Sequence, residues 1–473
     1  MVDALELVLA GLNWFVLAYF LIVNGFLLVL LAMAAVDLRS QRLDVWQEGR
    51  WRLLGSDVAP AISILAPAHN EERTVSESVR SLLTLRYPSL EVVVVNDGST
   101  DDTLETLRRE FDLAEIHAAP IRRRIETTPI RRLYRSRRTP ALVVVDKENG
   151  GKADALNAGL LVASGELACA IDADTIVEPD ALQRMIRPFL LDDRVVAAGG
   201  TLRVVNGSRV TAGRVIRQRA PRRFLPGVQA VEYLRAFLAG RVGWNRLGGN
   251  LIISGAFGLF RREPMITAGG YRHDTVGEDM ELVVRMRRLA HERGEPERIV
   301  FVPDPVAWTD VPRRVRVLAR QRDRWHRGLA DVIERHRGIL LNPRYGPMGL
   351  VVAPYFLFVE LLAPVVELLG LLLLAVSLPL GVVNVPFAVM LLIVAYGLGL
   401  LLTTLTIALE EWTYGGYGGL RDRLLLLGYG AIESVGYRQL TALWRVRGLA
   451  RHWRGHGDWG VMEREGFRPA SGP

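Results

Sequence analysis

Two aspartates, Asp172 and Asp174, follow an apolar run directly and are strong candidates for chemistry. The run Leu167 to Ile171 predicts a buried strand, which Pro179 prevents from continuing. In open parallel sheets, ligands bind just outside the carboxyl ends of the strands. Two acids one residue apart can hold a divalent ion whose other positions go to substrate phosphates. An isolated Asp-x-Asp also occurs by chance in many loops, so the surrounding sequence decides its weight.

The lysines give a second signal. Of 59 basic residues only Lys147 and Lys152 are lysine, and both lie in Asp-Lys-Glu-Asn-Gly-Gly-Lys. A compact ammonium differs from a planar guanidinium, and a Gly-Gly-Lys turn can cradle phosphate. We infer that at least one position requires lysine; the alternative is a chance pairing. The single cysteine, Cys169, excludes an intramolecular disulfide and is predicted to be a core residue.

Alternating patterns place these residues in a cytosolic α/β domain over residues 41–310. A parallel, doubly wound sheet is expected from this alternation. Each strand ends in a polar, acidic or glycine-rich loop, so the loops are predicted to meet at one edge. Besides the run before Asp172, the predicted strands are Ile62–Ala66, Leu90–Val95 and Ala141–Val145, and the predicted helices are Glu72–Leu85, Thr100–Glu110 and a helix opened by Gly150-Gly151-Lys152 that runs to Ala163.

Later in the domain, small residues interrupt the apolar stretch from Gly248 to Phe260. Small residues let a ligand approach the backbone closely. Glu278, Asp279 and Glu281 then begin a helix predicted to run to about His291. Acids in a first helical turn commonly complement the helix dipole, which is a serious alternative for Glu281.

The N-terminal segment predicts a membrane-spanning helix within residues 1–40. Leu7 to Val36 carries no charge and is long enough to cross a bilayer. A cleaved signal peptide is disfavoured because no basic residue precedes the run and the run is too long. Acids precede the run and arginines follow it, namely Asp3, Glu6, Arg39, Arg42, Arg50 and Arg52. The positive-inside rule therefore predicts an outside N-terminus and a cytoplasmic start for the following domain.

The C-terminal third predicts further membrane association. Residues 311–345 are expected to form amphipathic interface helices, and residues 346–445 to form membrane helices over roughly 348–377, 385–408 and, more weakly, 424–444. Four spans would place the basic tail, 446–473, outside, so the weaker segment is either interfacial or the first of the three is two pieces. Glu360 and Glu367 lie deep in apolar sequence; each is either functional or paired inside the helix bundle.

The net charge of +8 suits a membrane surface better than nucleic acid. The arginines flank membrane segments, and we find no aromatic-interleaved basic motif, so no nucleic-acid partner is expected. The segment Pro120–Pro140 carries eight arginines. It is either a basic face near anionic lipid or a solvated or partly disordered excursion.

Six motifs together resemble the membrane-integrated family 2 glycosyltransferases, the group of hyaluronan, chitin, cellulose and poly-N-acetylglucosamine synthases. They occur in family order and cover about residues 61–329. The last one points to the processive branch. The motifs are Pro67-Ala-His-Asn-Glu71, Asn96-Asp97-Gly98-Ser99, Gly150-Gly151-Lys152-Ala153, Asp172-Ala-Asp174, Gly277-Glu278-Asp279 and Gln321-Arg-Asp-Arg324-Trp325.

The resemblance implies a GT-A-type fold and a hexosyltransferase with Mg²⁺ or Mn²⁺. It implies that Glu71 and Asp97 hold the uracil and ribose of a UDP-sugar, that Lys152 approaches the diphosphate, and that Asp172 contacts the donor while Asp174, with Asp172, ligates the metal. It implies Asp279 as general base, with Glu278 beside it in the catalytic pair. Gln321, Arg324 and Trp325 would clamp the diphosphate, with Trp325 also supporting the acceptor, and Ser254, Gly255 and Ala256 would line the acceptor site.

The chemistry is also coherent from the residues alone. A leaving diphosphate needs its growing charge neutralised, and a carboxylate must take the acceptor proton. One base and no nucleophile suits single displacement with inversion, giving a β-linkage. The acids belong in the cytoplasm, where nucleotide sugars are made. We therefore expect a multi-pass protein of the cell membrane, with membrane lipids and a polysaccharide or glycolipid acceptor as partners.

Departures and alternatives remain. The second motif begins with Asn96 rather than aspartate, so only Asp97 is available there. The overall pattern is closest to chitin and poly-N-acetylglucosamine synthases, which favours UDP-N-acetylglucosamine. The alternatives are transfer of one sugar to a polyprenyl phosphate or glycolipid, and a non-catalytic membrane scaffold. The linkage, any protein partner and whether the chain secretes its product are left open.

Overall fold

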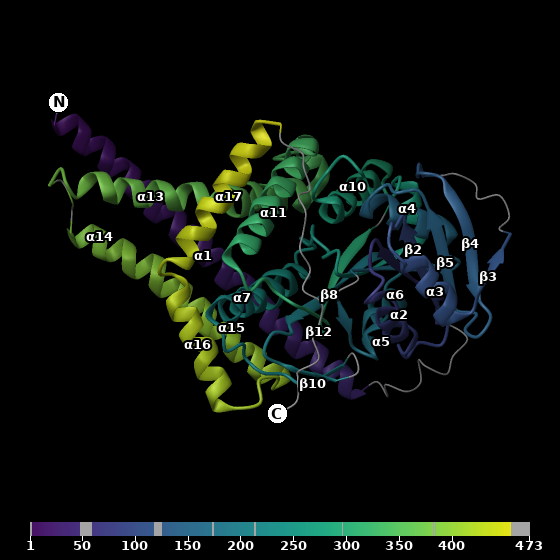
Figure 1. The fold of residues 1–473 in the computed structure, drawn as a ribbon. Helices are drawn as coiled ribbons and strands as arrows, with labels where there is room; N and C mark the ends of the chain where they lie inside the picture. Colours follow the sequence, from purple (N-terminus) through teal and green to yellow (C-terminus); the bar gives the residue numbers. More distant parts are fainter. Residues whose placement is uncertain are drawn as a thin grey trace. The chain divides into compact units, whose positions relative to one another are not determined.

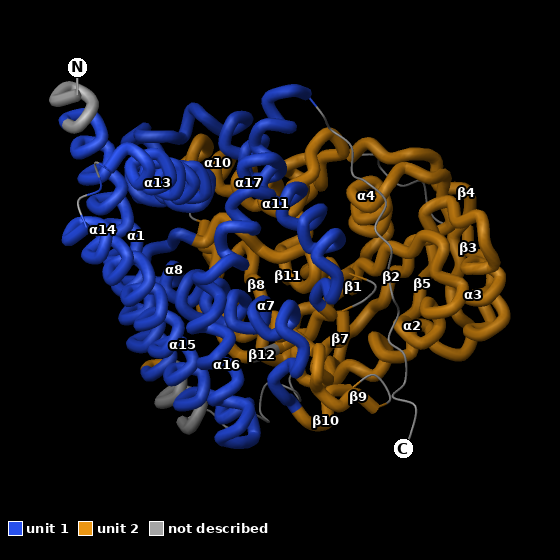
Figure 2. The backbone as a smooth tube through the Cα atoms, turned by 60° about the vertical axis from the view of Figure 1, so that its left-hand side comes forward, with its two compact units in different colours: residues 1–39, 218–249, 311–460 blue, residues 40–217, 250–310, 461–473 orange. Residues whose placement is uncertain are grey.

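The computed structural model describes residues 2–47, 59–117, 125–172, 175–211, 214–295, 297–381, 383 and 385–455, with the backbone alone for 2–6, 41–47 and 305. The chain forms two compact units (Figures 1 and 2). Unit 1 comprises residues 1–39, 218–249 and 311–460, and unit 2 comprises residues 40–217, 250–310 and 461–473.

Unit 2 is built on a sheet of ten strands in the order β3-β4-β5-β2-β1-β6-β11-β8-β12-β7. Its centre consists of four parallel strands, β5 (Leu142–Lys147), β2 (Leu90–Asp97), β1 (Ile62–Ala68) and β6 (Leu167–Ile171). These are the four strands that the apolar runs predict. Because they are parallel, their carboxyl ends, each followed by a polar loop, lie at one edge of the sheet. The predicted α/β fold with a parallel-rich sheet is confirmed.

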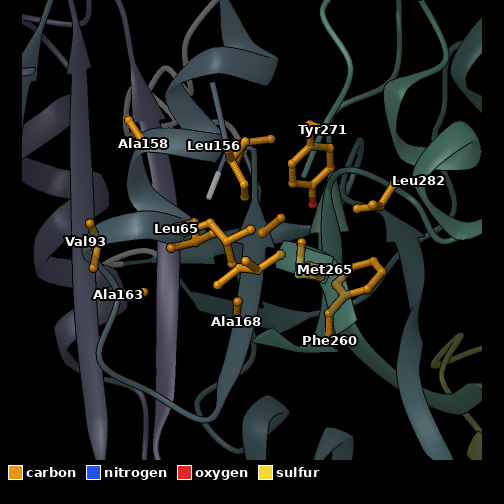
Figure 3. Close-up of a cluster of buried hydrophobic side chains, with 14 of the residues drawn as sticks. Leu65, Val93, Leu156, Ala158, Ala163, Ala168, Phe260, Met265, Tyr271 and Leu282 are labelled. Atoms are coloured by element: carbon orange, nitrogen blue, oxygen red, sulfur yellow. The ribbon is translucent and has the colours of Figure 1, made fainter. Parts of the chain in front are cut away.

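The central strands are buried on both faces, which explains their continuous apolar runs. Leu65, Val93 and Val95 lie in one hydrophobic cluster with helix α4 (Lys152–Val162), as Figure 3 shows for several of these side chains. Ile64, Val92 and Val94 are equally buried but do not belong to that cluster. Since side chains alternate along a strand, they face the other side of the sheet.

Two further helices follow the first two parallel strands. They are α2 (Val75–Leu83) and α3 (Thr103–Phe111), which lie side by side (Figure 1). The apolar positions Val75, Val79 and Leu82 are buried at helical spacing along α2. Each helix is a few residues shorter than its pattern predicts.

The arginine-rich segment is partly a strand of the sheet. β4 (Ile130–Ser136) pairs antiparallel with β5 and with the edge strand β3 (Leu113–Ile116). Leu133 and Tyr134 are buried, while Arg131, Arg132 and Arg135 point to solvent. Partial disorder, one form of the second alternative for this segment, is wrong for residues 130–136, because they form a strand that buries Leu133 and Tyr134 and leaves its arginines exposed. Residues 118–124 lie outside the described part of the chain.

The rest of unit 2 extends the sheet beyond β6 and covers it. β11 (Phe257–Arg261) is antiparallel to β6 and to β8 (Val195–Val204), and β12 (Arg298–Thr309) runs parallel to β8. Helix α10 (Glu278–Arg293) runs two residues beyond the predicted end at His291 and is capped by Gly294. The remaining elements are β7 (Ile176–Val177), α5 (Ala181–Met185), α6 (Arg187–Leu191), the hairpin β9 (Arg209–Thr211) and β10 (Arg214–Arg217), and α9 (Arg262–Thr267).

The described residues of unit 1 form helices joined by loops, without a strand. Helix α1 (Val2–Gln47) contains an apolar stretch, Leu7–Ser40, long enough to span a membrane, and Val385–Tyr414 is a second such helix. A third candidate is the pair Met348–Leu361 and Ala363–Ser377, bent by 42°. The helices of this unit after α1 are α7 (Phe224–Leu234), η2 (Arg235–Arg241), α8 (Val242–Trp244), α11 (Val315–Arg335), η3 (Arg337–Ile339), η4 (Pro343–Tyr345), η5 (Met348–Val352), α12 (Ala353–Tyr355), η6 (Phe356–Leu361), α13 (Ala363–Ser377), α14 (Val385–Leu392), η7 (Ile393–Gly397), α15 (Leu398–Tyr414), α16 (Leu420–Glu433) and α17 (Tyr437–Trp453).

The segment 424–444, predicted as a weaker span or an interfacial segment, is not one continuous helix. This segment is divided between α16 and α17, which are separated at Gly436, a residue with φ of 84°. A positive φ is open to glycine and breaks the helical path. Neither helix is among the candidate spans in the described residues.

The acids in the apolar C-terminal sequence have partners. Glu367 accepts a hydrogen bond of 3.0 Å from Arg438, and Glu360 lies 3.8 Å from Arg445. Glu433 accepts from Arg235 Nη1 over 2.6 Å. Of the two readings open for Glu360 and Glu367, pairing within the helix bundle is the one that these contacts favour.

Candidate active site

Lys152 and Asp172 meet at the carboxyl edge of the parallel strands in unit 2. Lys152 is the first residue of α4, and Asp172 follows the last residue of β6. Lys152 Nζ donates to Asp172 Oδ1 over 2.5 Å and lies 3.8 Å from Glu278 Oε1. Two motifs 20 residues apart in the chain therefore form one ion pair.

Glu278 and Asp279 reach the same place from the first turn of α10. The backbone N–H of Gly255 donates to Asp279 Oδ2 over 3.0 Å. A Cβ atom added at Gly255 would lie 3.3 Å from Lys152 Nζ and 3.6 Å from Asp279 Oδ2. The ammonium and the carboxylate therefore border the same small space, with the Gly255 backbone beside it.

The charges at this place are unbalanced. Burial alone would lower the pKa of Lys152, but Asp172 and Glu278 raise it above its ordinary value, so the amine stays charged. Burial, together with the charge of Asp279, raises the pKa of Glu278 to about 7. Lys152 is the one cation beside three carboxyl groups at this place, those of Asp172, Glu278 and Asp279.

Two residues without a predicted role hold the loop that leads to α10. Asn157, buried in α4, donates to Tyr271 O over 2.8 Å and accepts from Tyr271 N over 2.7 Å. Arg285 donates to Gly270 O over 2.6 Å and pairs with Glu281 over 2.8 Å. Glu281 is thus an ion-pair partner inside the fold. An amide in the apolar part of α4, beyond its first turn, is the sequence signal for Asn157.

Asp97 binds the backbone of the loop that precedes α4. Its carboxylate accepts from Gly150 N over 3.0 Å and from Gly151 N over 2.8 Å, and Lys147 Nζ donates to it over 2.6 Å. Asp97 and Lys147 are both buried. The sequence predicts a contact of Asp97 with the donor and no partner for Lys147. The two residues are paired because they lie opposite each other on the neighbouring strands β2 and β5.

The remaining predicted residues of unit 2 lie in loops of the sheet. Glu71 accepts from Thr74 over 2.5 Å, and its backbone N–H donates to Thr103. Ser254 and Ala256 flank Gly255 in the turn before β11, where Phe257 N donates to Ser254 O over 3.1 Å. Cys169 is buried in β6, as predicted.

Asp174, the predicted metal ligand, lies outside the described residues. Among the described residues, no cluster of three or more His, Cys, Asp or Glu forms a metal site. Asp172, however, provides the oxygen ligand that hard divalent ions prefer, and such ions are commonly held by one or two carboxylates plus substrate phosphates. The residues that are described fit an ion of this kind.

The motif of Gln321, Arg324 and Trp325 belongs to unit 1, on helix α11. The side chain of Trp325 is 43% exposed, and the guanidinium of Arg322 lies 4.8 Å from the centre of its ring. Arg322 donates to Glu232 over 2.5 Å, and Tyr437 OH donates to the same carboxylate over 2.8 Å. Arg322, which received no predicted role, supports the indole.

Comparison with known proteins gives related enzymes. A poly-β-1,6-N-acetyl-D-glucosamine synthase of Staphylococcus aureus (strain COL) is 29% identical over 280 residues, and that of Staphylococcus epidermidis is 28% identical over 275 residues. These alignments cover 59% and 58% of this chain, and 57% and 56% of the relatives' own length. The chain is thus matched to little more than half of each relative.

Among solved structures, a mannosyltransferase from Pyrobaculum calidifontis, in complex with GDP-Man and Mn²⁺, aligns with 22% identity and a TM-score of 0.48, covering 87% of this chain and 99% of that one. The family described as "Glycosyltransferase like family 2" matches residues 60–328, which is more than half of the 473 residues. This chain therefore belongs to the glycosyltransferase-like family 2.

Proposed function

We propose that the chain transfers a sugar from a UDP-sugar, UDP-N-acetylglucosamine foremost, to a growing β-linked polysaccharide. The observation that carries this proposal is the meeting of Lys152, Asp172, Glu278 and Asp279 around the Gly255 backbone in a family 2 glycosyltransferase. The choice of sugar is supported by relatives named poly-β-1,6-N-acetyl-D-glucosamine synthase.

In this proposal Asp279 is the general base. The acceptor oxygen forms a bond with the anomeric carbon, the bond from that carbon to the diphosphate breaks, and the acceptor proton passes to Asp279. The electron pair of the broken bond leaves with UDP. A single displacement inverts the anomeric centre. The N–H of Gly255 donates to Asp279 and keeps its carboxylate oriented towards the shared space.

Lys152 stabilises the charge that grows on the leaving diphosphate. Its ammonium is held by Asp172, so it is oriented before the donor arrives, which is the condition under which electrostatic stabilisation is strongest. Asp172 and Asp174 would hold Mg²⁺ or Mn²⁺, which supplies further charge neutralisation on the two phosphates. Glu278, next to both Lys152 and Asp279, keeps negative charge at the site low when it is protonated.

The proposed location is a membrane, with unit 2 on the cytoplasmic side. Two helices of the described residues, or three with the bent pair, are long and apolar enough to cross a bilayer. Nucleotide sugars are made in the cytoplasm, and arginines follow the apolar run of α1 in the sequence. The exposed indole of Trp325 would support the acceptor sugar, and Gln321 and Arg324 would contact the diphosphate.

Purified protein in nanodiscs, supplied with a panel of UDP-sugars and Mg²⁺ or Mn²⁺, tests this proposal by UDP release and product size. Metal-dependent turnover of one donor into a long chain is expected. A product one sugar longer than a lipid acceptor would establish the single-transfer alternative. Absence of turnover together with absence of nucleotide binding would contradict a transferase role and favour a scaffold.

A further inference from the structure

Lys147 is one of two lysines in the chain, yet it lies outside the space bordered by Lys152 and Asp279. Its side chain is fully buried at the end of β5. A charge without solvent is costly unless it is paired and hydrogen-bonded. The position therefore requires a specific set of partners.

The ammonium has three acceptors for its three N–H groups. Lys147 Nζ donates to Asp97 Oδ1 over 2.6 Å and to Glu148 O over 2.5 Å, and lies 2.5 Å from Asp154 Oδ2. A guanidinium presents five donors in a planar fork and does not match three acceptors gathered around one atom. This arrangement explains lysine in a chain that otherwise uses arginine.

The carboxylates of Asp97 and Asp154 also contact the loop of residues 148–152. Asp97 accepts from the backbone N–H groups of Gly150 and Gly151. Asp154, in the first turn of α4, accepts from Thr128 N over 2.9 Å. A Cβ atom at Gly150 would lie 2.5 Å from Asp154 Cγ, so this acid packs directly against the loop.

We propose that Lys147 is a positioning residue that fixes the Gly150-Gly151-Lys152 loop through Asp97 and Asp154, so that Lys152 meets the donor diphosphate. The claim about the donor rests on the proposed function. Asp97, which is also buried, is in this proposal a second residue that positions the loop. The ammonium of Lys147 also offsets one of the two negative charges of Asp97 and Asp154, which lie behind the loop that is proposed to bind the donor diphosphate.

The test uses full-length protein and three forms, wild type, Lys147→Met, and Lys147→Met with Asp154→Asn. The double variant removes one cation and one anion, so the buried net charge stays at its wild-type value and the variant is expected to fold. Hydrogen exchange of the segment 148–156 reports the loop, calorimetry with UDP reports donor binding, and the KM values for donor and acceptor are compared.

In the double variant we expect at least tenfold faster exchange of the loop amides, at least tenfold weaker UDP binding, and a raised donor KM with an unchanged acceptor KM. The single variant should show the same pattern more strongly. Unchanged loop exchange in the double variant overturns the proposal, as does its failure to fold, because Lys147 would then act on the fold as a whole. Faster exchange in a protein whose wild type binds no nucleotide upholds the positioning role and refutes the proposed function instead.

Discussion

Gly255→Ala tests the space between the ammonium and the base most specifically. The added methyl group would lie 3.3 Å from Lys152 Nζ and 3.6 Å from Asp279 Oδ2. The second distance is an ordinary contact, but the first requires the ammonium to move by a few tenths of an ångström. Since Nζ is hydrogen-bonded to Asp172, such a movement changes the position from which it meets the diphosphate.

The size of the effect follows from that displacement. A misplacement of 1 Å at a reacting group costs about 10²-fold in rate. A few tenths of an ångström therefore predicts a loss of about fivefold to tenfold in kcat/KM, equivalent to about 1 kcal/mol in the barrier. The backbone of Gly255 has no positive φ, so alanine should not lower the melting temperature and can raise stability by about 0.4–1 kcal/mol.

The assay is UDP release with donor and acceptor varied separately, accompanied by a melting curve. Gly338→Ala is the matched control, because Gly338 is exposed and an added Cβ meets nothing within 4 Å. Wild-type kcat/KM in Gly255→Ala would refute the reasoning, since the reacting groups would then not share this space. A lower melting temperature would show instead that the substitution disturbs the fold.

Three further predictions concern the same unit. Lys152→Met should lower kcat by about 10²–10³-fold, and Lys152→Arg should recover little of it, because the larger fork must fit where Nζ lies 2.5 Å from Asp172; initial rates with saturating donor decide this. Because the pKa of Glu278 is raised to about 7, its contribution to stability is full below about pH 4.5 and is lost as the pH rises to about 7. Glu278→Gln should therefore be more stable than wild type by up to about 3 kcal/mol at pH 8 and equal to it at pH 4.5. Melting curves at the two pH values without metal would contradict this if the difference did not grow with pH. Arg285→Met should cost about 3–5 kcal/mol because it leaves a buried acid unpaired, whereas Arg288→Met on the same helix should cost less than about 1 kcal/mol, since that ion pair is about one-third exposed; equal denaturant midpoints would contradict the buried pairing.

The parallel core of unit 2 was predictable because its signals are local. Each of β1, β2, β5 and β6 is predominantly apolar and is followed by a polar loop, and such runs are typical of strands buried on both faces. The carboxyl-edge position of Lys152 and Asp172 follows from parallel strands alone. Their ion pair confirms that the two motifs converge.

Contacts between distant segments could not be read in this way. Lys147 and Asp97 are 50 residues apart, and only the register of β2 with β5 brings them together. Asn157 meets Tyr271 across 114 residues. For the segment 424–444 the difference has another cause. Its composition resembles that of a weak membrane span, but the positive φ of Gly436 interrupts the helix.

The central claim, that Asp279 is the general base of glycosyl transfer, is tested most directly by comparing wild type with Asp279→Asn. The amide keeps the volume of the side chain and can still accept from Gly255 N, so the site geometry is retained. Nucleotide affinity by calorimetry and UDP release from the preferred donor are measured on the same preparations. The account predicts equal UDP affinity and at least a hundredfold lower turnover in Asp279→Asn. Equal turnover in the two proteins would contradict it.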